Sequence, residues 1–212
     1  MYPVMIQMKG KPCLVVGGGA VALRKIRTLL EEGAAVTVIA PDPCDAVKAF
    51  SRQGQIRLVE RSLCEDDCRG YALVITATGR KEAALMAASM AGREGFLYNA
   101  ADFPELGNCF IPARIRRGHL TVTVSTDGKS PAVAAAVKRW LDETMPDGFA
   151  EWLDRVAVIR RDIKKRKETP KERQFFWEHA LGKPVMELVA MGKLEKAEEV
   201  VRLGIGSFRD QS

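Results

Sequence analysis

The sequence predicts an α/β protein: a mostly parallel β-sheet in the N-terminal half, then a small α+β segment and a helical C-terminal part. Two observations along the 212 residues support this prediction. Over the first hundred residues, short apolar runs alternate with stretches of helical periodicity, the pattern of a parallel sheet covered by helices on both faces. From Phe149 onward only helical patterns follow.

The first strand–helix–strand unit is the clearest in the chain. Residues 12–16 form an apolar run typical of a buried strand, and a run of three glycines at 17–19 follows directly. Residues 20–32 have the apolar spacing of a helix, and Gly33 is a natural helix stop. Residues 36–40 read as the next strand. This order predicts a right-handed βαβ unit.

The alternation continues and then changes. The next expected elements are a helix at 44–53, strands at 56–59 and 71–77, a helix at 81–94 and a strand at 96–99. After residue 113 the pattern becomes a hairpin turn, a strand at 120–124, a loop and a helix at 132–145. We therefore expect three parts: a nucleotide-binding domain at 1–113, a middle segment at 114–148 and a helical domain at 149–212.

Composition and charge exclude several classes of protein. The chain is 47% hydrophobic and carries a net charge of +6, which suits an anionic partner without saying which. No basic region followed by a long apolar run opens the sequence, and no apolar run approaches the roughly 20 residues that span a bilayer. We expect a cytoplasmic protein with no membrane association. The five cysteines lack zinc-ligand spacing, so no metal site is expected.

The glycine run carries a dinucleotide-binding pattern, Gly17-x-Gly19-x-x-Ala22. The first glycine allows a tight turn, the second lets the backbone approach a pyrophosphate, and the small third residue permits close helix packing. A strand precedes the pattern and a helix follows it, as a Rossmann-like domain requires. We expect NAD to bind along this segment, which comprises Gly17, Gly18, Gly19, Ala20, Val21 and Ala22.

The adenosine end of this predicted site is less clear. An acidic residue near the end of the second strand would bind the adenosine ribose, but Ala40 stands there and Asp42 comes only after a proline. No arginine lies near Asp42 in the sequence that could bind the 2′-phosphate of NADP. Asp42 is therefore equally compatible with a ribose contact and with a helix or turn cap, and the choice between NAD and NADP stays open.

Several motifs together resemble the precorrin-2 dehydrogenase family, the N-terminal modules of siroheme synthases. They are the segment from Gly17 to Lys25, Thr76-Ala77-Thr78, Asn99-Ala100-Ala101-Asp102, Phe110-Ile111-Pro112 and the loop from Ser125 to Pro131. The resemblance extends to about Trp177. It implies NAD-dependent oxidation of precorrin-2, a polycarboxylate tetrapyrrole, to sirohydrochlorin. Some members also insert iron as ferrochelatases, and no feature of the sequence decides that point.

The resemblance also implies roles for individual residues. Asp102 matches the family's functional aspartate, although an aspartate before Phe-Pro is also common loop chemistry. Thr78 and Asn99, at strand ends, are expected at the nicotinamide half of the cofactor. The substrate's carboxylates need cations, for which Arg114 and Lys129 are candidates. Ser130 is expected near the tetrapyrrole or, alternatively, as a helix N-cap. Gly79-Arg80 departs from the acidic pair that often follows Ala-Thr in the family.

Two further expectations concern partners. The family's swapped homodimer would exchange the strand at 120–124 and the helix at 132–145 between copies, so 114–148 is the expected dimerisation segment. The alternative function is a nicotinamide-sensing, nucleic-acid-binding regulator, suggested by the basic run at 160–167. No helix-turn-helix is recognisable, so nucleic acid is not an expected partner.

Overall fold

A computed structural model describes residues 1–165 and 169–207. The chain divides into two compact units, Met1–Ile111 and Pro112–Ser212. Across these described ranges, every helix is too short or too polar to cross a membrane.

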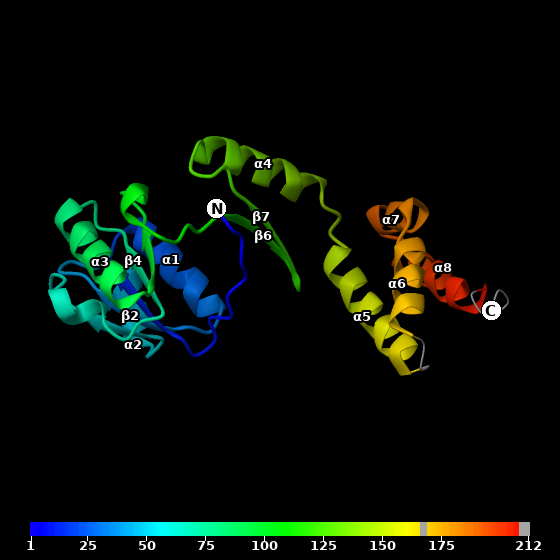
Figure 1. The fold of residues 1–212 in the computed structure, drawn as a ribbon, viewed down its shortest axis with the longest axis horizontal. Helices are drawn as coiled ribbons and strands as arrows, with labels where there is room; N and C mark the ends of the chain where they lie inside the picture. The colour runs from blue at the N-terminus through cyan, green and yellow to red at the C-terminus, as the bar shows by residue number, and fades with distance from the viewer. Residues whose placement is uncertain (166–168, 208–212) are drawn as a thin grey trace. The chain divides into compact units, whose positions relative to one another are not determined.

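The first unit is built on a five-stranded sheet in the order β3-β2-β1-β4-β5, with every neighbouring pair parallel. Figure 1 shows this unit in blue to green, with β2 and β4 labelled among its helices. The strands are β1 (Pro12–Val16), β2 (Ala35–Ile39), β3 (Ile56–Val59), β4 (Leu73–Thr76) and β5 (Leu97–Ala100). The helices are α1 (Ala20–Glu31), α2 (Asp45–Arg52) and α3 (Lys81–Glu94), with short 3-10 helices η1 (Glu65–Cys68) and η2 (Pro104–Leu106). This order confirms the Rossmann-like fold, with its topological switch point between β1 and β4.

Each face of the sheet buries its own hydrophobic core. Helix α1 places Ala22 and Ile26 against one face, where Val47 of α2 joins them. Helix α3 places Ala87 and Met90 against the opposite face. Because both faces are covered, the strands are mostly apolar, which is why the sequence shows apolar runs in place of a regular alternation.

The structure differs from the sequence prediction in small ways. Strand β4 spans only Leu73–Thr76, shorter than the apolar run at 71–77, because pairing with β1 covers only this stretch. The two 3-10 helices were not predicted, since such short turns have no periodicity to detect. Helix η1 is held instead by side chains: the carboxylate of Asp67 accepts a hydrogen bond from the backbone N–H of Cys64 (2.6 Å).

The second unit begins with an antiparallel hairpin and one helix. The hairpin joins β6 (Ala113–Arg117) to β7 (Leu120–Val124), and α4 (Pro131–Thr144) follows. Ser130 is the N-cap of α4 and accepts a hydrogen bond from Val133 N (3.2 Å). Only Ile115 and Ala134 are buried hydrophobic side chains in this part, whereas Trp140 is 62% exposed.

Four helices complete the second unit and share a separate core. They are α5 (Phe149–Lys165), α6 (Pro170–Ala180), α7 (Lys183–Ala190) and α8 (Leu194–Ser207). Their buried side chains include Trp152, Ile159, Phe176 and Val189. The helical C-terminal region predicted from Phe149 onward is thereby confirmed.

A dinucleotide site at the carboxyl edge of the sheet

The glycine turn after β1 is a tight steric fit. Gly17 has φ +123°, a conformation that L side chains rarely adopt, and a Cβ placed there would overlap the carbonyl oxygen of Ala77, which follows β4. A Cβ at Gly18 would lie 2.5 Å from the Cα of Pro43, in the loop after β2. Three strand ends therefore meet around two glycines. No larger residue fits at either position.

Gly19 has the opposite surroundings. It is the N-cap of α1, and a Cβ at this position would meet no atom within 4 Å. No side chain caps the helix, and its first turn has no acidic residue. The N–H groups of the first turn therefore face open space with the positive end of the helix dipole behind them, the arrangement that binds phosphate groups. Ala22, behind this turn, is fully buried and permits close packing of α1 on the sheet.

The loop between β2 and α2 lies against the glycine turn. Cys44 N donates a hydrogen bond to Gly18 O (3.0 Å), and Pro43 is buried. Asp42, just before it, is exposed. The N-cap of α2 is Cys44, with no side-chain capping bond, so the structure gives Asp42 no role as a helix cap. It lies in the loop after β2, at the carboxyl edge of the sheet.

At the other end, the loops after β4 and β5 are joined by a side chain. The carboxylate of Asp102, through Oδ2, accepts a hydrogen bond from Gly79 N (2.7 Å). Gly79 has φ +68° and is exposed, as is Asp102. Thr78 Oγ1 accepts from Arg80 N (3.0 Å), which shapes the approach to α3. Of the Gly79-Arg80 pair that departs from the family pattern, Gly79 therefore donates the bond that holds Asp102, while Arg80 N bonds to Thr78.

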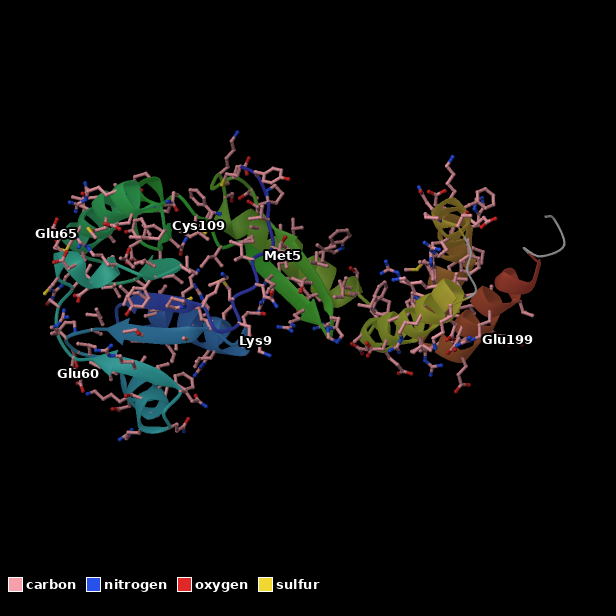
Figure 2. All side chains as sticks on the ribbon, turned by 60° about the horizontal axis from the view of Figure 1, so that its bottom comes forward. Met5, Lys9, Glu60, Glu65, Cys109 and Glu199 are labelled. Carbon is pink, nitrogen blue, oxygen red and sulfur yellow. The ribbon has the colours of Figure 1, made fainter. Side chains whose placement is uncertain are left out.

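The side-chain oxygen of Asn99 is a hydrogen-bond acceptor that has no donor partner among the described residues. Asn99 lies on β5, is 93% buried, and donates from Nδ2 to the carbonyl of Cys109 (2.8 Å; Cys109 is labelled in Figure 2). Its Oδ1 is buried with no hydrogen-bond partner among the described residues. A buried amide oxygen without a partner is costly, so a ligand with an N–H donor would satisfy it. The nicotinamide carboxamide is such a donor.

Cys109, whose carbonyl accepts a hydrogen bond from Asn99, is a titratable group that interacts with Lys25. Burial raises the pKa of the Cys109 thiol, with Lys25 of α1 acting in the opposite direction. Burial likewise lowers the pKa of the Lys25 ammonium, and its neighbour Arg24 adds to this effect. On the opposite face, Tyr98 donates to Ala84 O (2.9 Å) and lies 2.8 Å from Thr76 Oγ1. Sequence patterns did not identify these supports, because their partners lie far apart along the chain.

A dinucleotide fits this edge of the sheet. The two glycines that admit no Cβ bring the backbone close, Gly19 leaves space at the start of α1, and the unpartnered oxygen of Asn99 lies near the end of β5. Residues Gly17 to Ala22, Asp42, Thr78, Asn99 and Asp102 all belong to the first unit and to the carboxyl ends of its strands. Ligands of open α/β sheets bind at this edge.

The predicted substrate-binding residues belong to the second unit. Arg114 is half-buried on β6, opposite Thr123. Lys129 is exposed in the loop before α4, and Ser130 uses its hydroxyl to cap that helix. The N-cap alternative for Ser130 therefore describes its observed contact, while substrate binding by these three residues stays a prediction. Of the basic run, residues 160–165 lie on α5, and 166–167 lie outside the described residues.

Comparisons with known proteins identify the family. Residues 4–113 match the family described as putative NAD(P)-binding, and residues 148–203 match the sirohaem synthase dimerisation region. A precorrin-2 dehydrogenase of Priestia megaterium is 31% identical over 173 residues, covering 79% of this chain and 85% of that protein. The chain belongs to the precorrin-2 dehydrogenase family. The likeness extends past Trp177, so it includes helices that the sequence motifs left unexplained.

Members of this family occur at two lengths. A siroheme synthase of Methylococcus capsulatus is 35% identical over 199 residues, which cover 94% of this chain but 42% of that protein. The chain thus spans less than half the length of the siroheme synthases that it matches. A solved structure of SirC, a precorrin-2 dehydrogenase, matches with a TM-score of 0.77 and 28% identity, covering 94% of this chain and 99% of SirC.

The match to the dimerisation region falls on α5 to α8, at 148–203, while the sequence prediction put the dimerisation segment at 114–148. The role of 114–148 in a dimer stays a prediction.

Proposed function

We propose that this protein oxidises precorrin-2 to sirohydrochlorin with NAD⁺. The observation that carries the proposal is the likeness to SirC over nearly the full length of both chains, with the glycine turn intact. In this reaction precorrin-2 loses two electrons and two protons, so the products are sirohydrochlorin, NADH and one proton. NAD⁺, when bound, supplies the hydride acceptor.

The residues of the chain would divide the remaining work. The glycine turn and the open start of α1 would hold the pyrophosphate, and Asn99 Oδ1 would accept a hydrogen bond from the carboxamide, fixing the orientation of the nicotinamide ring. Asp102 has one oxygen bound to Gly79 N, which leaves Oδ1 to face the macrocycle. A carboxylate held in this way suits the role of general base for the departing proton.

The proposal extends to the setting of the reaction. A polycarboxylate substrate needs cations, for which Arg114 and Lys129 are the candidates, and Ser130 is a third candidate for a substrate contact. A homodimer in the cytoplasm is the expected form, and the match to a dimerisation region supports the dimer. No observation favours nucleic acid as a partner.

The test is to give the purified protein enzymatically generated precorrin-2 and NAD⁺ with metal ions chelated. We expect NADH formation together with the absorption spectrum of sirohydrochlorin. The Asp102→Asn variant keeps an acceptor for Gly79 N but removes the base, so its turnover should fall by about 100-fold. Glu105→Gln, an exposed carboxamide replacement on η2, is the matched control and should retain wild-type turnover.

Other outcomes separate the alternatives. A folded protein that binds NAD⁺ but does not oxidise precorrin-2 would contradict the proposal, and salt-sensitive DNA binding by that protein would favour the regulator. An active Asp102→Asn variant would keep the activity and remove Asp102 as the base. Adding Fe²⁺ after the oxidation tests for ferrochelatase activity. Among the described residues no three His, Cys, Asp or Glu side chains gather as a metal site.

A further inference from the structure

The carboxyl ends of β2 and β3 form the adenosine end of the cofactor site. The strands run in parallel with Ile39 opposite Val59, and Ala40 N donates to Val59 O (3.1 Å), so the segments that follow them leave the sheet side by side. The segment after β2 is fixed to the glycine turn through Pro43 and Cys44. A dinucleotide whose pyrophosphate lies at that turn would place its adenosine ribose here.

The charges at this end are acidic. Asp42 follows β2 and Glu60 follows β3 (Glu60 is labelled in Figure 2), and both are exposed. Within the described ranges, neither carboxylate has a hydrogen bond or an ion pair. A free carboxylate at this point accepts hydrogen bonds from the ribose hydroxyls and repels a 2′-phosphate.

One cation follows the two strands, and it is already engaged. Among residues 40–44 and 60–64, Arg61 is the only basic residue. Its guanidinium forms a two-pronged ion pair with Asp67, with Nη1–Oδ2 2.6 Å and Nη2–Oδ1 2.7 Å, and Nη1 also donates to Ser62 O (2.9 Å). Such a pair occupies the Nη1/Nη2 edge of the guanidinium, an edge that would otherwise be able to bind a phosphate.

We propose that the adenosine end of this site is built to reject NADP⁺: Asp42, with Glu60, repels a 2′-phosphate, and Asp67 withholds the one arginine that could bind it. This inference rests on the proposed function for the presence of a dinucleotide. It goes further in assigning the choice between the two cofactors to named residues. Asp67 acts as a positioning residue, because it touches Arg61 and not the nucleotide.

The test measures the dissociation constants of NAD⁺ and NADP⁺ by calorimetry, without substrate. ADP-ribose and its 2′-phosphate serve as second probes, since they lack the nicotinamide and report on the adenosine end alone. The wild type should bind NAD⁺ at least about 100-fold more tightly than NADP⁺. Asp42→Asn removes the negative charge at nearly constant shape and should reduce this ratio by about tenfold.

Two variants separate the role of Arg61 from damage to η1. Asp67→Asn and Arg61→Ala both break the ion pair, but only Asp67→Asn leaves a free guanidinium. We expect Asp67→Asn to tighten NADP⁺ binding by about 3- to 10-fold, while Arg61→Ala leaves it unchanged. Asp66→Asn is the control for charge loss next to Asp67, since Asp66 is an exposed partner of Arg69.

Several results would overturn the inference. Equal binding of NAD⁺ and NADP⁺ by the wild type would do so, as would an unchanged ratio in Asp42→Asn, or equal effects of Asp67→Asn and Arg61→Ala. The proposed function fails differently: selective NAD⁺ binding with no oxidation of precorrin-2 would leave this inference standing and remove the substrate.

Discussion

The two ends of the proposed cofactor site are built in different ways. The glycine turn is a close approach of backbone segments. Gly17 and Gly18 fit there because a Cβ atom would overlap Ala77 and Pro43, respectively. The loops after β4 and β5 are made by side chains, with Asp102 bound to Gly79 N and Asn99 bound to Cys109 O. An added Cβ atom therefore disrupts the glycine turn, whereas loss of a hydrogen-bonding side-chain atom disrupts the loops after β4 and β5.

The largest effect should come from adding a methyl group at Gly17. Gly17→Ala places a Cβ on the carbonyl of Ala77 and forces an L residue to φ +123°, so we expect unfolding free energy to fall by about 3 kcal/mol or more. Urea denaturation measures this loss. The matched control is Gly19→Ala, where the space is open: its stability should change by less than about 0.5 kcal/mol, while NAD⁺ binding weakens. Equal losses for the two variants would contradict the steric account.

Removing the amide of Asn99 should have the next largest effect. Asn99→Ala leaves the carbonyl of Cys109 without its donor and should lower unfolding free energy by about 2 kcal/mol. The variant also lacks the acceptor Oδ1, so NAD⁺ should bind more weakly while ADP-ribose, which has no carboxamide, binds as before. Calorimetry with the two ligands checks this difference. A parallel loss for ADP-ribose would show that Asn99 acts through the fold alone.

A smaller effect is expected at Gly79, where the backbone and the side chain of Asp102 meet. A Cβ there has open space, so Gly79→Ala costs only the left-handed backbone conformation, about 1 kcal/mol. Gly79→Asn should cost less, because asparagine tolerates this conformation. We expect turnover to follow the same order, since both variants change how firmly Asp102 is held. If alanine and asparagine affect turnover equally, the conformation of Gly79 does not matter for Asp102.

The smallest effect concerns the Arg61–Asp67 ion pair and its dependence on pH. The hydrogen bond from Arg61 holds the pKa of the Asp67 carboxyl below its ordinary value of 3.8 in the folded protein. The pair therefore stabilises the fold above about pH 4, and this contribution is lost as the pH falls through the lowered value. We expect this contribution to be small, because Arg61 is 45% exposed and solvent screens the pair. The stability of wild type minus Asp67→Asn, followed from pH 7 to pH 3, should shrink toward zero.

The glycine turn was predictable from the sequence, whereas the side-chain contacts were not. Gly17, Gly19 and Ala22 have a fixed spacing at the junction of a strand and a helix. This spacing, together with the flanking elements, is sufficient to predict the conformation of the turn. The alternation of apolar runs likewise predicted the parallel sheet, with strand ends within one or two residues for most elements. These features depend on neighbours along the chain.

The bond between Asp102 and Gly79 joins residues 23 apart, and the one between Asn99 and Cys109 joins residues 10 apart. No periodicity links such pairs, so the sequence suggested Asp102 and Asn99 only through the family resemblance. It likewise left Asp42 undecided between two roles, because a capping bond depends on where α2 begins, at Asp45 after Cys44.

The contact between Gly18 and Pro43 has a consequence for the entropy and the kinetics of cofactor binding. Because the loop after β2 is fixed against the glycine turn during folding, through packing and the bond from Cys44 N to Gly18 O, the cradle exists before any nucleotide arrives. The loop therefore loses its conformational entropy when the protein folds, and not when the nucleotide binds. Association should therefore follow a single bimolecular phase, with no slow isomerisation after the collision.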